Sequence, residues 1–425
     1  MNRVPFLVVA LACSLSLVQI LPARGPAPAE QELQQLLQEA QKFLDAQKLD
    51  EAVAVLKKAT KLAPNSDKLF ASISDLERQT GKYADGIEHA LQAIKLNDKV
   101  PTYYLLVAIN AYNLQDLDRA REYCDLVLKR GGKELDPAVF KDATAIAALL
   151  TKQTYTINWT LDPQKGRQAT PNSSLVVTLP KTDLPYQTAT YEVTGAQSFR
   201  IEKKDANDIL HLVPKGKQTI HLTTKVTVVP YSYKKQLAKA APGPLPAGAR
   251  EFLGASESID PKSPVLVKLV AGLKGSNDEE TARNILEWLR KNIKYRLQKA
   301  SIGEVDFKTM EEIVERGHAE CRGYTLLFTA LCRAAGVPAR PVWGLAKLPG
   351  TESNPKGAFA SHNWCEVYVN GCGWVPVDPQ KPESFGLQPN TNLRFFMDEK
   401  KSKSLLEILP MINLILMNGE TIKFE

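Results

Sequence analysis

The sequence predicts a multidomain protein with an α-helical repeat region, an antiparallel β-sandwich and an α+β catalytic domain, in that order. Three observations predict this fold class. A helical pattern recurs every 34 residues near the N-terminus, as the step from Leu49 to Tyr83 shows. Short runs rich in Thr, Val and Ile follow it, and a cysteine that begins an amphipathic helix then precedes two strands. The 425 residues allow roughly two to four domains.

Charge and the N-terminal segment indicate an exported globular protein. The formal net charge of +7 is mild for this length and forms no basic patch for nucleic acid. Residues 1–25 are predicted to be a signal peptide, because Arg3 precedes an apolar run and small residues follow it. We expect export to the periplasm or the extracellular space and no other contact with a membrane. An uncleaved N-terminal anchor is the alternative, since the apolar run is long.

Residues 27–153 are predicted to be helices that repeat. At a shift of 34, the second helices share three positions: Ala52, Gly86 and Ala120; Leu56, Ala90 and Cys124; Ala59, Ala93 and Val127. The pattern resembles tetratricopeptide repeats, although the first helices share only a small residue. Three units and a capping helix at residues 136–153 meet the minimum for a stable stack. The resemblance implies a concave groove for a peptide or protein partner; a spacer that packs on the enzyme is the alternative. His89 is expected on the surface or in a satisfied core.

Residues 154–238 contain six or more short strands separated by turn residues, which predicts an antiparallel sandwich. His211 and His221 flank a turn and could meet across a hairpin. A metal site would need another ligand nearby, and none is evident. We therefore expect two exposed strand histidines, with no metal and no cofactor. Residues 239–250 are predicted to be a Pro/Gly/Ala linker that buries no side chains.

The predicted catalytic domain, residues 251–400, is organised around Cys321. Apolar spacing after Cys321 predicts a helix that ends at Gly336, before Pro338. A thiol at a helix N-terminus faces free N–H groups and the positive end of the helix dipole, so we expect the thiolate to be favoured. A small buried hydrophobe is the alternative role. Two further helices are expected upstream, at residues 278–291 with a cap from Asn277, and at residues 308–316.

Two later strands supply a base and a carboxylate. A three-residue loop at residues 369–371, with Gly371 left-handed, would pair Tyr368 with Cys372. That register places His362 directly opposite Asp378, within reach across the strands. A cysteine paired with a histidine that a carboxylate orients is the arrangement used for thiol acyl transfer. His318, three residues before Cys321, is the rival base.

The segments ECRGYTLLFTALCRAAGVPAR, SHNWCEVYV and GWVPVDP, in this order, resemble the transglutaminase-like superfamily of papain-related thiol enzymes. The resemblance extends upstream through residues 282–295 and covers roughly residues 255–395. It implies that Cys321 attacks an amide of a peptide or protein, that His362 protonates the leaving amine and that Asp378 orients His362. The acyl-enzyme then passes to water, as in a cysteine peptidase or amidase, or to an amine. Hydrolysis is slightly favoured. Trp364 and Glu366 belong to the motif and are expected to pack rather than react.

The alternative function is a non-catalytic exported scaffold that binds a partner through its repeats and carries a relic catalytic domain. Without the signal segment the chain has five cysteines, and we expect no structural disulfide among them. Residues 401–425 are predicted to be a C-terminal β-hairpin extension that turns at Asn418 and Gly419.

Overall fold

The computed structural model describes residues 28–131, 135–161, 175–204, 207–237, 243–256, 258–296, 309–348, 359–381, 384–397 and 422–424. Contacts divide the chain between Thr151 and Lys152 into two compact units. The predicted signal peptide and the predicted turn at Asn418 and Gly419 lie outside the described residues. Within the described ranges, no helix is both long and apolar enough to span a bilayer.

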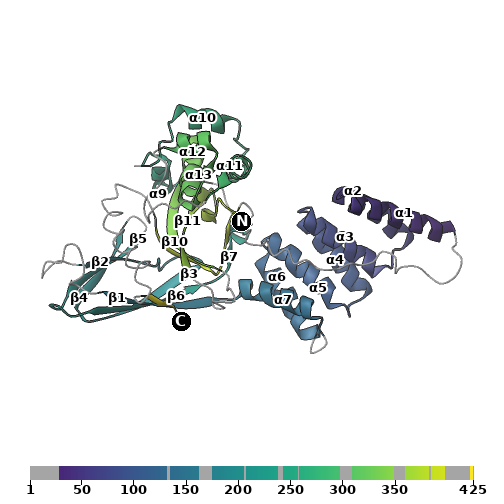
Figure 1. Cartoon of the computed structure of the whole chain (residues 1–425), viewed down its shortest axis with the longest axis horizontal. Coiled ribbons are helices and arrows are strands. Elements are labelled where there is room, and N and C mark those ends of the chain that lie inside the picture. The colour runs from purple at the N-terminus through teal and green to yellow at the C-terminus, as the bar shows by residue number, and fades with distance from the viewer. Residues whose placement is uncertain are drawn as a thin grey trace. The chain divides into compact units, whose positions relative to one another are not determined.

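The first unit is built from helices that contact one another in sequence order (Figure 1). The predicted helical repeats are therefore confirmed, as is a further helix after the third pair. The helices are α1 (Pro28–Asp45), α2 (Leu49–Leu62), α3 (Asp67–Gln79), α4 (Tyr83–Leu96), α5 (Pro101–Asn113), α6 (Leu117–Gly131) and α7 (Pro137–Leu150).

Small residues at the repeated positions allow the helices of this unit to approach closely. Ala52 and Ala120 are fully buried, and Gly86 occupies the equivalent position on α4. A Cβ atom at Gly86 would lie 2.8 Å from Oδ1 of Asn110 on α5, so a larger residue would displace the Asn110 side chain from its place between the helices. The small residues that repeat in the sequence therefore mark the positions where helices pack closely.

His89 lies in a satisfied environment, as predicted. Its Nδ1 atom is 2.8 Å from Oε2 of Glu77, a buried carboxylate that also pairs with Lys57 at 2.8 Å. The hydrogen bond to Glu77 raises the pKa of His89 above its ordinary value. These contacts account for His89 without a ligand.

The second unit begins with the predicted β-sandwich. Its two antiparallel sheets have the strand orders β15-β1-β6-β3 and β2-β5-β4. The C-terminal strand β15 (Ile422–Phe424) pairs with β1 at the edge of the first sheet. The other strands are β1 (Gln153–Leu161), β2 (Leu175–Leu179), β3 (Gln187–Thr194), β4 (Ala196–Lys204), β5 (Asn207–Pro214) and β6 (Ile220–Val228).

His211 and His221 do not meet across a hairpin. Both were expected to be exposed on strands; His221 is exposed, whereas His211 is half-buried. His211 lies on β5 and His221 on β6, and these two strands belong to different sheets of the sandwich. The chain crosses from one sheet to the other at the turn between β5 and β6. His211 instead lies 2.8 Å from Glu202 on β4, while His221 is exposed.

The predicted linker is more ordered than its composition indicated. The backbone N–H of Gly243 donates to the side chain of Asn370, and the Asn370 side chain donates to the Gly243 carbonyl. A short helix, α9 (Ala247–Arg250), follows and buries Ala249. The expectation that residues 239–250 bury nothing is therefore wrong, because this segment docks on the turn between two strands of the catalytic region.

The catalytic region combines four longer helices with a sheet of order β12-β11-β10-β14. In Figure 1 these helices gather at one end of the second unit and the sandwich strands lie at the other. The helices are α10 (Pro264–Ala271), α11 (Asp278–Asn292), α12 (Met310–Arg316) and α13 (Cys321–Ala335). The sheet strands are β10 (Ala339–Lys347), β11 (Phe359–Val369), β12 (Gly373–Val377) and β14 (Asn392–Met397). Shorter elements are β7 (Tyr231–Ser232), β8 (Lys294–Tyr295), β9 (His318–Ala319), β13 (Leu387–Gln388), α8 (Lys234–Leu237) and a 3-10 turn (Glu251–Leu253).

Helix α13 is the centre of this region, because it contacts α10, α11, α12 and strands β10 and β11. Its buried residues share one core with Cys365 and Val367 of β11. Trp343 and Phe395, from β10 and β14, instead pack with the buried residues of the sandwich. One face of the catalytic sheet therefore shares a hydrophobic core with the sandwich, and the other face packs on α13.

Candidate active site

The candidate nucleophile, Cys321, is the first residue of α13, as predicted. Glu320 caps this helix: its carboxylate accepts hydrogen bonds from the backbone N–H groups of Arg322 at 2.8 Å and Gly323 at 2.9 Å. The helix ends at Gly336, whose φ of 92° is the left-handed conformation expected of a C-terminal glycine. The sequence after Cys321 thus fixes the thiol at the N-terminus of a buried helix.

Two side chains contact the Cys321 thiol. Sγ lies 3.3 Å from Oε2 of Glu320 and 3.9 Å from Oδ1 of Asn363 on β11. Because a thiol carries one proton, the shorter contact indicates that this proton is directed toward Glu320. The contact with Asn363 places the sulfur beside the end of β11 that carries His362.

The expectation that the Cys321 thiolate is favoured is not met in this geometry. Burial, together with the charge and the hydrogen bond of the Glu320 carboxylate, raises the pKa of the Cys321 thiol to about 12. The backbone N–H groups of Asn363 and Arg322 act in the opposite direction but do not outweigh these effects. The prediction considered the helix dipole and did not consider the acidic residue that caps the same helix.

His362 and Asp378 form the predicted pair. Nε2 of His362 lies 2.9 Å from Oδ2 of Asp378, and the two side chains are 13% and 8% exposed. Burial acts to raise the pKa of Asp378, but His362, Lys381 and the N–H of Gln380 together lower it below its ordinary value. Asp378 is therefore held as a carboxylate. It fixes Nε2 of His362 and leaves Nδ1 as the nitrogen available to other groups.

The predicted strand register is wrong by two residues, yet the predicted pairing survives. Tyr368 pairs with Trp374 and not with Cys372, so the connecting loop is residues 370–372. Gly371 is left-handed as expected, with φ of 81°, but Gly373 is left-handed as well, with φ of 85°. An even shift keeps side chains on the same face of a sheet, so His362 and Asp378 meet diagonally instead of directly opposite.

The structure brings His362 and Asp378 together and places Cys321 beside the neighbouring Asn363. Among the hydrogen bonds of the described residues, none joins the Cys321 sulfur to His362. The rival base His318 lies on β9, where it pairs with Lys294 of β8, and among the hydrogen bonds of the described residues none joins its ring to the thiol.

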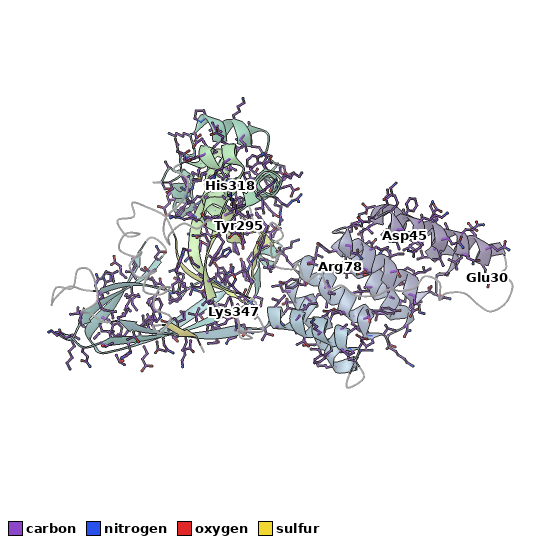
Figure 2. All side chains as sticks on the ribbon, in the orientation of Figure 1. Glu30, Asp45, Arg78, Tyr295, His318 and Lys347 are labelled. Carbon is purple, nitrogen blue, oxygen red and sulfur yellow. The ribbon has the colours of Figure 1, made fainter. Side chains whose placement is uncertain are left out.

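Sequence reasoning missed two residues of the site, Glu320 and Tyr295. Strand β8 runs parallel to β9 and sets Tyr295 beside Ala319, two residues before the nucleophile. Figure 2 shows Tyr295 and His318 in the same region of the second unit. Tyr295 is 51% exposed. Burial of its hydroxyl and the nearby charges of Cys321, Glu320 and Asp378 raise its pKa to about 12, so this hydroxyl stays protonated. Glu320 could have been found from its position as N-cap, whereas Tyr295 was placed by a strand pairing that its sequence does not reveal.

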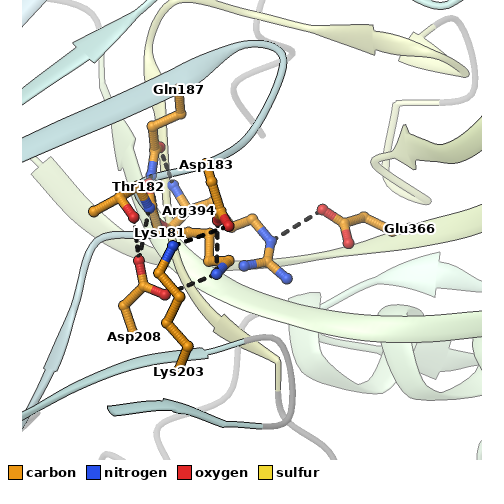
Figure 3. A network of polar contacts seen from close by, with 8 residues as sticks. All are labelled: Lys181, Thr182, Asp183, Gln187, Lys203, Asp208, Glu366 and Arg394. Carbon is orange, nitrogen blue, oxygen red and sulfur yellow. Dashed lines mark hydrogen bonds and ion pairs between the residues drawn. The ribbon is translucent and has the colours of Figure 1, made fainter. Parts of the chain in front are cut away.

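Glu366 and Trp364 have structural roles, as expected. The buried Glu366 carboxylate pairs with Arg340 at 2.6 Å and with Arg394 at 3.0 Å, and it accepts a hydrogen bond from Tyr186 at 2.9 Å. Figure 3 shows how Arg394 continues this network toward Gln187 and Lys181 of the sandwich. The ring of Trp364 is buried and lies 5.9 Å from the imidazole of His362. These residues secure the strand that carries His362.

The described residues contain no cluster of three or more His, Cys, Asp or Glu side chains suited to a metal ion. The cysteines at positions 124, 321, 332, 365 and 372 are all free thiols. The chemistry offered by the described site is therefore that of a thiol, an imidazole and carboxylates.

A cysteine that begins the central helix and a His–Asp pair on the adjoining sheet are the features of a cysteine-based enzyme. The comparison with protein families agrees: residues 267–379 match the model of the Transglutaminase-like superfamily. The chain therefore contains a transglutaminase-like domain, and this match supports a thiol enzyme at the level of the family.

Two relatives were found by sequence. The chain is 34% identical over 124 residues to an uncharacterized protein of Haemophilus influenzae, a match that covers 25% of this chain and 32% of that protein. It is 32% identical over 139 residues to the kyphoscoliosis peptidase of Mus musculus, covering 32% of this chain and 21% of that protein. The chain thus spans about a third of one relative and about a fifth of the other.

The chain has limited similarity to solved structures. A candidate cysteine protease from Cytophaga hutchinsonii has a TM-score of 0.40 and 14% identity, and the match covers 64% of this chain and 85% of that chain. The tetratricopeptide-repeat domain of Sgt2 from Aspergillus fumigatus has a TM-score of 0.26 and 15% identity, covering 29% of this chain and 82% of that chain. The order of domains is a tetratricopeptide-like helical region, a sheet-rich region and a transglutaminase-like α+β domain.

Proposed function

We propose that this protein is a thiol enzyme that acts on amides of peptides or proteins through Cys321, His362 and Asp378. The observation that carries the proposal is the 2.9 Å contact between His362 and Asp378. This pair lies at the end of β11 where the Cys321 sulfur contacts Asn363. The transglutaminase-like match, which includes all three residues, supports the same assignment.

In the proposed mechanism, Asp378 holds His362 through Nε2, so that Nδ1 accepts the proton of the Cys321 thiol. The electron pair left on sulfur attacks the amide carbonyl. His362 then returns the proton to the leaving amine, and an acyl-enzyme remains on Cys321. The backbone N–H of Cys321, at the start of α13, is a candidate donor to the oxyanion.

We favour transfer of the acyl group to water over transfer to an amine. Support comes from the relative of Mus musculus, which is named a peptidase. The two outcomes share every step up to the acyl-enzyme and differ only in the acceptor that reaches it. A single assay with a competing amine therefore separates them.

The test is turnover of a peptide mixture by the purified full chain, with and without a fluorescent primary amine, and products identified by mass spectrometry. We expect free acids to exceed amine adducts, and Cys321→Ala to abolish both. Cys332→Ala is the matched control, because Cys332 lies on the same helix, is fully buried and should not affect the chemistry. Turnover that survives in Cys321→Ala would overturn the proposal and favour a non-catalytic scaffold.

We also propose that the helical repeats bind a peptide or protein partner. The support is the stack of helical hairpins at a 34-residue repeat, an architecture that forms concave surfaces. A crosslinking experiment on the full chain tests this: partner peptides should map to helices α1, α3 and α5. Crosslinks confined to residues 152–425 would contradict it.

We further propose that the protein is exported through its N-terminal segment. The support is the order of Arg3, an apolar run and small residues in the sequence. The mass of the mature chain tests this, because cleavage should remove about 25 residues. An intact N-terminus in a membrane fraction would favour the anchor instead.

A further inference from the structure

The cap of helix α13 differs from the other side-chain caps of the described helices. Those caps are short residues, namely Ser66, Asp116, Asp136, Asn277 and Thr309. Glu320 is longer, and both of its oxygens are in use: Oε1 accepts from Gly323 N–H and Oε2 from Arg322 N–H. The carboxylate therefore occupies the N–H groups that a thiolate at this helix end would otherwise face.

Glu320 also contacts the nucleophile itself. Its Oε2 atom lies 3.3 Å from the Cys321 sulfur, closer than the 3.9 Å from the sulfur to Asn363. A carboxylate accepts a hydrogen bond from a neutral thiol but repels a thiolate, because both groups would then be negative. In this arrangement Glu320 stabilises the protonated form of the nucleophile. The thiol pKa, raised to about 12, agrees with this geometry.

The other charged groups near the thiol do not reverse this effect. Arg322, the next residue of α13, favours the thiolate through its backbone N–H. Tyr295 of β8 faces the thiol with a hydroxyl that is neutral at ordinary pH. His362 and Asp378, from the sheet, are bonded to each other, and Lys381 lies 3.6 Å from Asp378. Glu320 is thus the carboxylate in direct contact with the sulfur.

We propose that Glu320 is a positioning residue that keeps Cys321 as a neutral thiol in the resting enzyme, until the sulfur turns from Glu320 toward His362. This inference rests on the proposed function. On activation, the S–H bond breaks, the proton moves to Nδ1 of His362, and the electron pair remains on sulfur. Glu320 keeps its hydrogen bonds to the N–H groups of Arg322 and Gly323, so the helix end stabilises the thiolate only in part, and the imidazolium supplies the rest.

The test measures alkylation of Cys321 by iodoacetamide in the full chain, site by site, from about pH 5 to about pH 10. In the wild type we expect slow alkylation that still rises at the upper limit. Glu320→Gln keeps the size of the cap and removes its charge. We expect it to raise the rate near pH 8 by about tenfold or more, the change in thiolate fraction for one pKa unit.

The matched control is Glu280→Gln, because Glu280 accepts a backbone N–H at the start of α11 but does not contact the thiol. It should leave the alkylation profile of Cys321 unchanged. The buried thiols of Cys332 and Cys365 report folding in the same experiment, since they should remain unmodified in every folded variant. If Glu320→Gln does not fold, the wild-type profile alone decides.

Two outcomes would overturn the proposal. One is a wild-type profile with a midpoint at or below the ordinary thiol value of about 8.5. The other is a folded Glu320→Gln variant whose alkylation rate is within about twofold of the wild type, well short of the factor of ten for one pKa unit. Alkylation needs no substrate, so the result is independent of turnover. A positive result without turnover of any peptide would retain the role of Glu320 and count against the proposed function.

Discussion

Two carboxylates near strand β11 have opposite surroundings. Glu366 is buried between the guanidinium groups of Arg340 and Arg394, at 2.6 Å and 3.0 Å. Burial would raise the pKa of Glu366, but these two cations lower it to about 2. Glu320 instead contacts backbone N–H groups and a thiol, a neighbour that would become negative on ionisation. The charge of Glu366 is neutralised by two arginines, whereas Glu320 influences whether the Cys321 thiol keeps its proton.

The Glu366 cluster on β11 is therefore structural, whereas the group formed by Glu320, Cys321 and the nearby His362 of β11 is reactive. Opposite charges that are always present make a buried ion tolerable, and removing one of them exposes the other to an apolar environment. A carboxylate beside a nucleophile instead changes the protonation of that nucleophile and has little effect on the free energy of unfolding. We therefore expect substitution of His362 to lower mainly turnover and substitution of Glu366, on the same strand, to lower mainly the free energy of unfolding.

The largest effect is expected for His362→Ala. Loss of a general acid–base lowers turnover by about 10²–10⁴-fold. The loss of unfolding free energy should be smaller than at Glu366, because Asp378 keeps Lys381 and the N–H of Gln380 as partners. Turnover of peptides and urea unfolding measure the two quantities. His221→Ala, at an exposed position on β6, is the control and should change neither. Equal losses of turnover in both variants would remove His362 from the mechanism.

Glu366→Ala should act in the opposite way. It leaves Arg340 and Arg394 without their shared partner, and breaking a buried ion pair costs about 3–5 kcal/mol of unfolding free energy. Urea unfolding at pH 7 measures this loss. Glu192→Ala, an exposed carboxylate on β3, should stay within about 0.5 kcal/mol of the wild type. A loss below about 1 kcal/mol, the range of an exposed pair, would show that the cluster is not the anchor of this sheet.

The sequence predicted the features that depend on local rules. Helix α13 begins at Cys321, α11 is capped by Asn277, and Gly336 is left-handed, all as expected. The pairing of His362 with Asp378 was also predicted, because alternation along a strand survives an even shift in register. Local chemistry therefore located the candidate site.

The features that depend on tertiary contacts were not predictable. The register changed because Gly373 joined Gly371 in the left-handed conformation, which a sequence does not distinguish from an extended glycine. His211 and His221 separated because the chain crosses between sheets at their turn. The raised pKa of Cys321 needed both its burial and the direction of the Glu320 side chain. In each case the sequence did not show which backbone conformation, sheet or side-chain direction the folded chain adopts at that position.

The low pKa of Glu366 predicts a dependence of stability on pH. A carboxylate whose folded pKa is about 2 and whose unfolded pKa is about 4.3 stabilises the fold above pH 4.3, and this contribution is lost as pH falls toward 2. The loss should be roughly 3 kcal/mol. Urea unfolding at several pH values measures it, and Glu366→Gln should flatten the acid branch. An unchanged acid branch in Glu366→Gln would assign the loss to other carboxylates.

The smallest effect is expected for Tyr186→Phe, which tests how the cluster divides its stabilisation. The Tyr186 hydroxyl donates to Glu366 at 2.9 Å, and a hydrogen bond to a charged group is worth about 1.5–3 kcal/mol. The two arginines remain in place, so the loss should lie at the lower end of that range. Tyr191→Phe, at a partly exposed position on β3, should change the unfolding free energy by less than about 0.5 kcal/mol. A loss as large as that of Glu366→Ala would mean that Tyr186, and not the charges, holds Glu366 in position. The contrast between Glu366, neutralised by two arginines, and Glu320, which influences the proton of Cys321, would then need revision.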